Sequence, residues 1–380
     1  MTDITLYGAI GDGKTDCSPF IKKALENEKE IYFPSGTYLI TEELIIPSFR
    51  HIRLADDAVL YACDGCFNKA GVRAVITNSD YENGNEDIIF EGGTINANNH
   101  GNHKEDWRHG PSQGLTFSFI GVKGLTLRNF TIYNSESYHI RLVKTSHYLI
   151  ENLVFDADCC PFCQDGIHHS GYCHDGVIRN ITAKNGCTND DLIAFNADDV
   201  NFYSHNWGQI NGPIHDITVE NVCSDNCHGA VRILSIENAV YNITLSNFTV
   251  GVKHMAFNLD AARYCADPMF TDDQYPSGVG NIKNILVENI TAWKSPFVHP
   301  HVYCWNDNNY SNDALLTLET NGEITFKNIT RDLTRDVNKN APTIKVKSVF
   351  GSLNLNGEET PLNGEALYFS PSEFDLQIKK

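Results

Sequence analysis

Leu127-Arg128-Asn129-Phe130-Thr131 is one of seven segments in which an asparagine separates two strand-like runs and, in most cases, a threonine follows two positions later. Successive asparagines are 23, 28, 41, 26, 42 and 39 residues apart. The short steps fit one coil of a solenoid, and the long steps fit a coil with an inserted loop or two coils. The series consists of Asn129, Asn152, Asn180, Asn221, Asn247, Asn289 and Asn328.

This spacing has a physical explanation in a parallel β-helix. Alternate side chains of short strands fill a stacked interior, and we expect Leu125, Leu127, Ile140 and Leu142 to lie there. A tight corner between strands needs the left-handed backbone region, which asparagine tolerates best after glycine. Stacked asparagine amides also hydrogen-bond from coil to coil. The Asn-x-Thr sequences are therefore interpreted as corners rather than glycan acceptors.

One helix is predicted near the start of the chain. Ser18 is suited to cap it, Pro19 to occupy its first position, and residues 20–25 to form its apolar face. A solenoid exposes an open apolar end, so we expect this helix to cover that end.

The corner series also suggests how the chain is divided. We expect a single domain over residues 1–380, with a cap and first strands in 1–50 and coils that carry a groove in 51–330. The series stops after about residue 331, so 331–380 is expected to be a short cap or an irregular tail.

The charge balance limits the possible partners. Against 29 basic residues stand 48 acidic ones, for a net charge of −19. General affinity for nucleic acid or for a membrane surface needs basic surface, so we expect neither partner. An acidic polysaccharide stays possible, because a few local Arg or Lys residues suffice to bind it. Nothing in the sequence predicts an oligomeric state.

The sequence also bears on location. No apolar run reaches the roughly 18 to 20 residues of a membrane span. The chain starts at Met1 without the basic and apolar regions of a signal peptide. We expect a cytoplasmic protein, or a secreted one if a leader has been removed.

The chain contains 12 cysteines, which is far below the density of a disulfide scaffold. Two pairs have the Cys-x-x-Cys spacing of metal or redox sites, Cys63 with Cys66 and Cys160 with Cys163. Two histidines, Cys173 and a third histidine follow the second pair, so a zinc site is an alternative there. We favour free thiols in a reducing compartment, since no second well-spaced pair accompanies Cys160.

Candidate catalytic residues lie in two acidic segments. Gln164-Asp165-Gly166-Ile167 is followed 25 residues later by Asn189-Asp190-Asp191. On successive coils these three carboxylates would share one groove, where one acts as an acid and the others activate water. The alternative is that Asp-Gly and Asp-Asp pairs only form turns. Asp198 and Asp199 add carboxylates suited to sugar hydroxyls, with a structural role about equally expected.

Three segments carry a family resemblance. Residues 7–16, Tyr-Gly-Ala-Ile-Gly-Asp-Gly-Lys-Thr-Asp, resemble the N-terminal signature of the pectate-lyase-like β-helix superfamily. Residues 32–38, Tyr-Phe-Pro-Ser-Gly-Thr-Tyr, are similar to the strand that follows in those proteins. Residues 91–97 resemble a turn of the polygalacturonases, glycoside hydrolase family 28. The resemblance implies a right-handed parallel β-helix and no cofactor.

The family lines its groove with four motifs. Asp165 falls where the aspartate of Asn-Thr-Asp is expected, and Asp190-Asp191 matches Gly-Asp-Asp. Arg232 falls at the arginine of Arg-Ile-Lys, but Leu234 replaces the lysine. For Gly-His-Gly, His205 is the nearest candidate.

The resemblance implies an inverting glycosidase that acts on a pectin-like or related oligo- or polysaccharide. Asp190 would protonate the leaving oxygen, while Asp165 and Asp191 would activate water. Inversion typically needs roughly 6.5 to 9.5 Å between acid and base. Crowding the three carboxylates would raise a pKa and keep the acid protonated.

Further candidates for substrate contacts alternate with apolar residues or flank the acids. His139 and Arg141 are expected to face outward at the groove edge, and Arg232 to clamp substrate rather than only to solvate a coil. His168 or His169 is a candidate proton shuttle. The remaining candidates are Asp198 and His205, with Trp107, Trp207 and Tyr264 as rings that stack on sugar or pack elsewhere, and Asp260 with Arg263 as a subsite or a surface ion pair.

Two other functions remain open at this stage. In a calcium-dependent β-elimination lyase, Arg232 would act as the base. The calcium ligands would be Asp190, Asp191, Asp198 and Asp199. A non-catalytic carbohydrate-binding solenoid would use the same groove without turnover. For the hydrolase, insertions at 98–113 and 261–280 would block one end of the groove and give exo action on short oligosaccharides.

Overall fold

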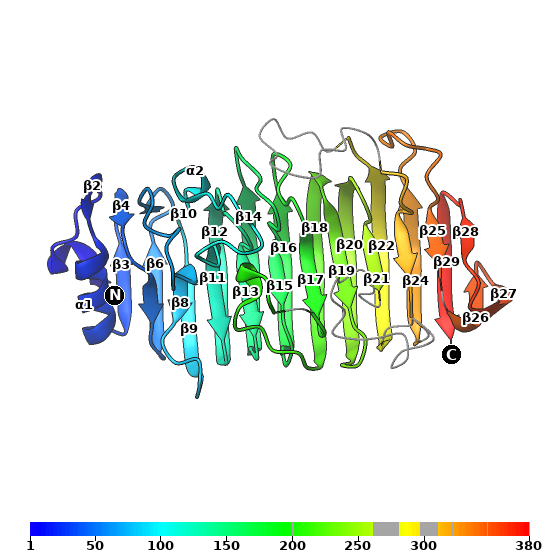
Figure 1. Cartoon of the computed structure of the whole chain (residues 1–380), viewed down its shortest axis with the longest axis horizontal. Coiled ribbons are helices and arrows are strands. Elements are labelled where there is room, and N and C mark those ends of the chain that lie inside the picture. Colours follow the sequence, from blue (N-terminus) through cyan, green and yellow to red (C-terminus); the bar gives the residue numbers. More distant parts are fainter. Residues whose placement is uncertain (200, 261–280, 297–310, 321, 348, 380) are drawn as a thin grey trace.

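The chain forms a right-handed parallel β-helix whose coils stack along one long axis (Figure 1). The computed structural model describes residues 1–380 apart from 200, 261–280, 297–310, 321, 348 and 380. Within the described residues the strands form one sheet of 18 and a second sheet of 11. From β3 to β24 the pairings between coils are parallel, as the corner series predicted.

The first sheet contains the strands that carry the corners. Its strands are β1(Thr2–Asp3), β2(Asp12–Asp16), β3(Glu30–Phe33), β4(Thr37–Ile40), β6(Arg50–Leu54), β7(Val59–Ala62), β9(Asn85–Glu91), β10(Thr94–Asn96), β12(Val122–Tyr133), β14(Ser146–Asp156), β16(His174–Ala183), β18(Ile214–Cys227), β20(Val240–Val252), β22(Ile282–Lys294), β24(Ile324–Arg331), β26(Phe350–Leu355), β27(Glu358–Asn363) and β29(Glu373–Lys379).

The second sheet carries the face on which the candidate site lies. Its strands are β5(Leu44–Ile46), β8(Ala74–Asn78), β11(Leu115–Ile120), β13(Ile140–Val143), β15(Ile167–His169), β17(Asp191–Asn196), β19(Gly229–Leu234), β21(Phe257–Asp260), β23(Leu316–Leu318), β25(Ile344–Val346) and β28(Leu367–Phe369).

The asparagine corners and their amide ladder are confirmed. All seven asparagines lie in the left-handed region, with φ between 53° and 61°. Each amide from Asn152 onward donates to the side-chain oxygen of the asparagine one coil earlier, over 2.7 to 3.2 Å. A second left-handed column, which the sequence analysis did not identify, precedes it by five residues; it includes Asp216, Asn242 and Asn284. The two left-handed positions bend each long strand at two points, and the coil changes direction at both.

The interior is an aliphatic and aromatic stack. Leu125, Leu127, Ile140 and Leu142 are buried, as predicted. This continuous core keeps successive coils in register, because a slip of one residue would turn its apolar side chains outward.

The two ends of the solenoid are closed differently (Figure 1). The predicted helix, α1(Ser18–Asn27), packs Ile21, Ala24 and Leu25 on the first coil. Its expected cap is wrong: Ser18 is the first helical residue, and Asp16 accepts its N–H over 2.9 Å. The short helices are η1(Ile4–Tyr7), α2(Asn99–Asn102) and η2(Ser204–Asn206). None of the described helices is both long and apolar enough to span a bilayer.

The C-terminal region is ordered β-structure rather than an irregular tail. Strand β29 pairs antiparallel with β24, and β28 pairs antiparallel with β25. Strands β26 and β27 form an antiparallel hairpin. The reversal of strand direction ends the parallel stack, which explains why the corner series stops.

The expectation of free thiols fails for one pair. Cys63 and Cys66 form a disulfide, with Cα atoms 5.6 Å apart. Cys160, Cys163 and Cys173 are buried.

Asn221 allows the corner to be tested. Replacing Asn221 by alanine should lower the free energy of unfolding by about 1–2 kcal/mol, because alanine is strained at φ 60° and the two ladder bonds are lost. Asn221→Gly loses the same bonds but tolerates the backbone, so it should cost less. Urea unfolding of both variants measures the difference. Equal losses would show that the left-handed backbone contributes nothing.

Candidate active site

A cavity of about 340 Å³ lies against the second sheet and contains the predicted acids. It is lined by Trp107, Arg108, Tyr138, Cys163, Asp165, Asp190, Asp191, Asn196, Asp199, Tyr203, His205, Asn206, His228, Arg232, Met255 and Asn258. The parallel register explains this gathering, since these residues come from positions far apart in the sequence but from neighbouring coils.

The three acids enter the cavity where coils turn into the second sheet. Asp165 lies two residues before β15, and Asp191 begins β17. The Gly166 N–H donates to the Asp191 carbonyl over 3.0 Å, which ties the two coils together beside the carboxylates. On the following coil, a side chain at Gly229 would place its Cβ 2.7 Å from Asp191 Oδ1 and would displace that carboxylate.

The carboxylates are closely spaced. One oxygen from each of Asp165, Asp190 and Asp191 lies within 4.8 Å of the others. This separation is shorter than the roughly 6.5 to 9.5 Å typical of inverting enzymes. Since the limit of 4.8 Å joins single oxygen atoms, whereas the inverting distance is measured between carboxyl groups, inversion stays a prediction of the resemblance.

The cluster holds protons at unusually high pH. Burial, and then repulsion by Asp165, raises the pKa of Asp190 to about 7. Burial, and then the neighbouring Asp190, also raises the pKa of Asp191, while burial raises that of Asp165 well above its usual value. Asp190 and Asp191 keep 23% and 14% of their side-chain surface exposed, so both remain accessible from the cavity.

Arg232 is the cation of the cluster. Its Nη1 lies 4.0 Å from Asp191 Oδ2, and its Nε lies 3.5 Å from Asp260 Oδ2. It stands on β19 with its guanidinium in the cavity, as predicted. Arg232 partly offsets the repulsion among the acids and also pairs with Asp260. Arg263 lies outside the described residues.

His168 contacts the carboxylate of Asp165 from a buried position. Its Nδ1 lies 2.6 Å from Asp165 Oδ2, and its ring stacks on Tyr138 with the centroids 4.2 Å apart. Burial lowers the pKa of His168 to about 3, so its ring is neutral. Because it has no exposed surface, it orients Asp165 rather than contacting substrate.

The prediction that His139 faces outward is wrong. Its ring is buried against Phe155 of the interior, and its Nδ1 lies 2.8 Å from the Asp165 carbonyl. His169 also lies inside the coil, stacked on Phe195, with Nδ1 2.8 Å from the Ala194 carbonyl. Both rings are fully enclosed, so neither contacts a ligand in the groove, and His139 instead fixes the backbone of Asp165.

Arg141 and Asp198 have structural partners instead of the expected substrate contacts. Arg141 lies on the outer column of β13, but the segment 204–207 covers it, and it donates to the carbonyls of His205 and Trp207. Asp198 Oδ2 accepts the N–H groups of residues 236, 237 and 238. Each of these side chains is fully buried and holds a loop.

His205 and Trp107 form an aromatic wall of the cavity. Their rings stack 5.7 Å apart, and Tyr203 stacks on His205 at the same distance. Arg108 lies over the Trp107 ring at 4.6 Å. Trp107 and Arg108 belong to the insertion 98–113, which therefore lines the cavity. That this insertion blocks one end of the groove stays a prediction. Trp207 lies elsewhere and is 42% exposed, while Tyr264 and the insertion 261–280 lie outside the described residues.

His228 was not predicted from the sequence. This histidine precedes β19 and lines the cavity, with its Nδ1 3.8 Å from Asp190 Oδ1. Burial lowers its pKa well below the usual value, so the ring is neutral beside Asp190. Its place in Cys227-His228-Gly229, just before Arg232, was the available signal, since a His-Gly pair is part of the family's third motif.

Two known proteins are similar to this chain in sequence. A pre-neck appendage protein of Bacillus phage B103 is 24% identical over 76% of this chain, which spans only 33% of that protein. A probable rhamnogalacturonase C of Aspergillus flavus is 26% identical over 78% of this chain and 57% of its own length.

A solved structure shows the same fold. The family 28 exopolygalacturonase of Yersinia enterocolitica superposes with a TM-score of 0.58 at 17% identity, over 91% of this chain and 67% of that one. Residues 1–253 match the family model described as rhamnogalacturonase A/epimerase, pectate lyase-like. This match covers about two thirds of the sequence, and the chain therefore belongs to that pectate-lyase-like family of rhamnogalacturonases and epimerases.

Proposed function

We propose that this chain hydrolyses glycosidic bonds in a pectin-like or related oligo- or polysaccharide. The observation that carries the proposal is the cluster of Asp165, Asp190 and Asp191, whose nearest oxygens lie within 4.8 Å in an open cavity. Such a cluster retains a proton near neutral pH and has a further carboxyl group beside it, which glycoside hydrolysis requires.

The roles within the cluster follow the family. Asp190 gives its proton to the glycosidic oxygen while the bond from that oxygen to the anomeric carbon breaks. A water molecule attacks this carbon and gives a proton to Asp165 or Asp191 once that carboxyl is ionised. Arg232, 4.0 Å from Asp191, stabilises the ionised form, and the Trp107–His205 wall offers a ring surface for sugar.

A calcium-dependent lyase is the less favoured reaction. Three carboxylates provide oxygen ligands of the kind that calcium takes. The nearby Arg232, with Nη1 4.0 Å from Asp191 Oδ2, opposes a further cation at this position. A non-catalytic binding role is the second candidate, because the chain is also similar to a phage pre-neck appendage protein.

Asp190→Asn tests the reaction directly. It should lower the release of new reducing ends from pectic oligosaccharides by about 10²–10⁴-fold, since the amide cannot donate the acid proton. Asp56→Asn, at an exposed turn outside the cavity, is the matched control and should keep full activity. Activity that a chelator abolishes would contradict the proposal, and so would an unchanged rate in Asp190→Asn.

The raised pKa of Asp190 is testable without a known substrate. An unfolded aspartate ionises near pH 4, whereas Asp190 in the folded protein ionises at about 7. The folded state therefore binds the extra proton, and stability falls as pH rises from about 4 to 7. Asp190→Asn removes this loss, so it should raise the midpoint of thermal unfolding at pH 8 and have little effect at pH 4. An equal effect at both values would show an ordinary pKa.

A further inference from the structure

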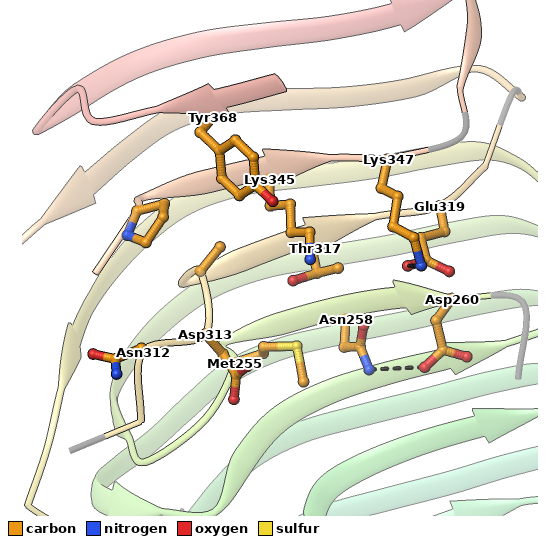
Figure 2. Close-up of a pocket in the computed structure, with 12 residues that line it drawn as sticks. Met255, Asn258, Asp260, Asn312, Asp313, Thr317, Glu319, Lys345, Lys347 and Tyr368 are labelled. Carbon is orange, nitrogen blue, oxygen red and sulfur yellow. Dashed lines mark hydrogen bonds and ion pairs between the residues drawn. The ribbon is translucent and has the colours of Figure 1, made fainter. Parts of the chain in front are cut away.

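A second cavity of about 550 Å³ continues the first along the second sheet. The two cavities share Met255 and Asn258 in their walls. Beyond these residues the second cavity is formed by β23, β25 and β28, and Figure 2 shows Thr317, Lys345 and Tyr368 side by side on these strands. A ligand that occupies the acidic cavity therefore has a continuous path toward the C-terminal coils.

The strand register places this path on one column of residues. Arg232 pairs with Asn258, Asn258 with Thr317, Thr317 with Lys345, and Lys345 with Tyr368. Three strand steps separate Arg232 from Lys345, a distance of about 14 Å at the usual spacing between strands. The column thus carries a second cation a few sugar units from the candidate catalytic acids.

The carboxylates of the second cavity already have basic partners. Glu319 lies 2.9 Å from Lys347 Nζ, and Asp260 lies 3.5 Å from Arg232. Asp313 lies 2.8 Å from His254 Nδ1, and this hydrogen bond lowers the pKa of its carboxyl group.

Lys345 differs from the other cations of the cavity. Among the described residues it has no carboxylate partner, and its Nζ lies 5.8 Å from the centre of the Tyr368 ring. The Tyr368 ring itself is 59% exposed. Lys345 is therefore the cation of this cavity that is left for an anionic ligand, in a protein whose net charge is −19.

We propose that the second cavity is a subsite for an anionic sugar, with Lys345 on its carboxylate or sulfate and the Tyr368 ring against its apolar face. The proposal rests on the proposed function in one respect, that the groove binds a glycan. It adds that the glycan is acidic and that the protein binds one of its charged sugar units several positions from the cleaved bond.

Lys345→Gln tests the subsite by binding. Calorimetry in the Asp190→Asn background, which leaves the ligand intact, would compare an oligogalacturonide, its methyl-esterified form and a sulfated galactan oligosaccharide. Lys345→Gln should weaken binding of an anionic probe about fivefold, the effect of one partly exposed charge-assisted hydrogen bond, and leave the neutral ester unchanged. Lys123→Gln, exposed on β12 of the other sheet, is the matched control and should change neither.

Each outcome bears on the proposal. A loss confined to the oligogalacturonide assigns a uronate, a loss confined to the sulfated probe assigns a sulfated sugar, and both losses assign any anionic sugar. Equal weakening of acidic and neutral probes, no effect of Lys345→Gln, or no binding before that substitution would overturn the subsite.

The result is separable from the proposed hydrolysis. A charge-dependent loss in Lys345→Gln without any turnover by the unsubstituted protein would keep the subsite and remove the hydrolase. Turnover that Asp190→Asn abolishes, together with unchanged binding in Lys345→Gln, would keep the hydrolase and remove the subsite.

Discussion

The left-handed asparagine corner is the constraint on which the rest of the structure depends. It turns each coil at the same point, and the amide ladder from Asn129 to Asn328 holds those points in line. Parallel strands then stack in fixed register, so residues separated by 25 or more positions become neighbours. Without that register Asp165 and Asp191 would not meet, nor would Arg232 share a column with Lys345.

The same register brings acidic side chains that repel one another to one point of the solenoid. Three carboxylates are largely withdrawn from water. Arg232 on the next coil pairs with Asp191 and, one coil further on, with Asp260. The neutral rings of His168 and His228 flank the cluster without adding positive charge. The folded protein therefore holds a proton on Asp190 up to its pKa of about 7, and ionising the cluster costs stability, as is common where a site is built for chemistry.

Much of this arrangement was predictable from local patterns. The asparagine series predicted the fold because a corner is a local backbone requirement, and the two acidic segments predicted the cluster because they fall one coil apart. His169 was predictable as interior, since it follows Ile167 by two positions and alternation puts both on one face. His139 precedes its strand, where alternation does not apply, and its inward ring could not be foreseen.

Contacts between distant segments lay beyond the sequence. Arg141 faces outward as predicted, yet the segment 204–207 covers it. No local sequence pattern predicts that this loop lies there. The antiparallel cap at β28 and β29 likewise depends on pairing with β25 and β24. The second cavity depends on three separate strands, and so the position of Lys345 emerged only from the structure.

The most direct test of the account is mass spectrometry of pectic oligosaccharides cleaved in water enriched in oxygen-18. Hydrolysis by the acid cluster predicts products with one heavy oxygen at each new reducing end, with or without chelator. Unsaturated products without the label would show elimination, and intact oligosaccharides would show a binding protein. Either result would contradict the assignment of Asp165, Asp190 and Asp191 to hydrolysis.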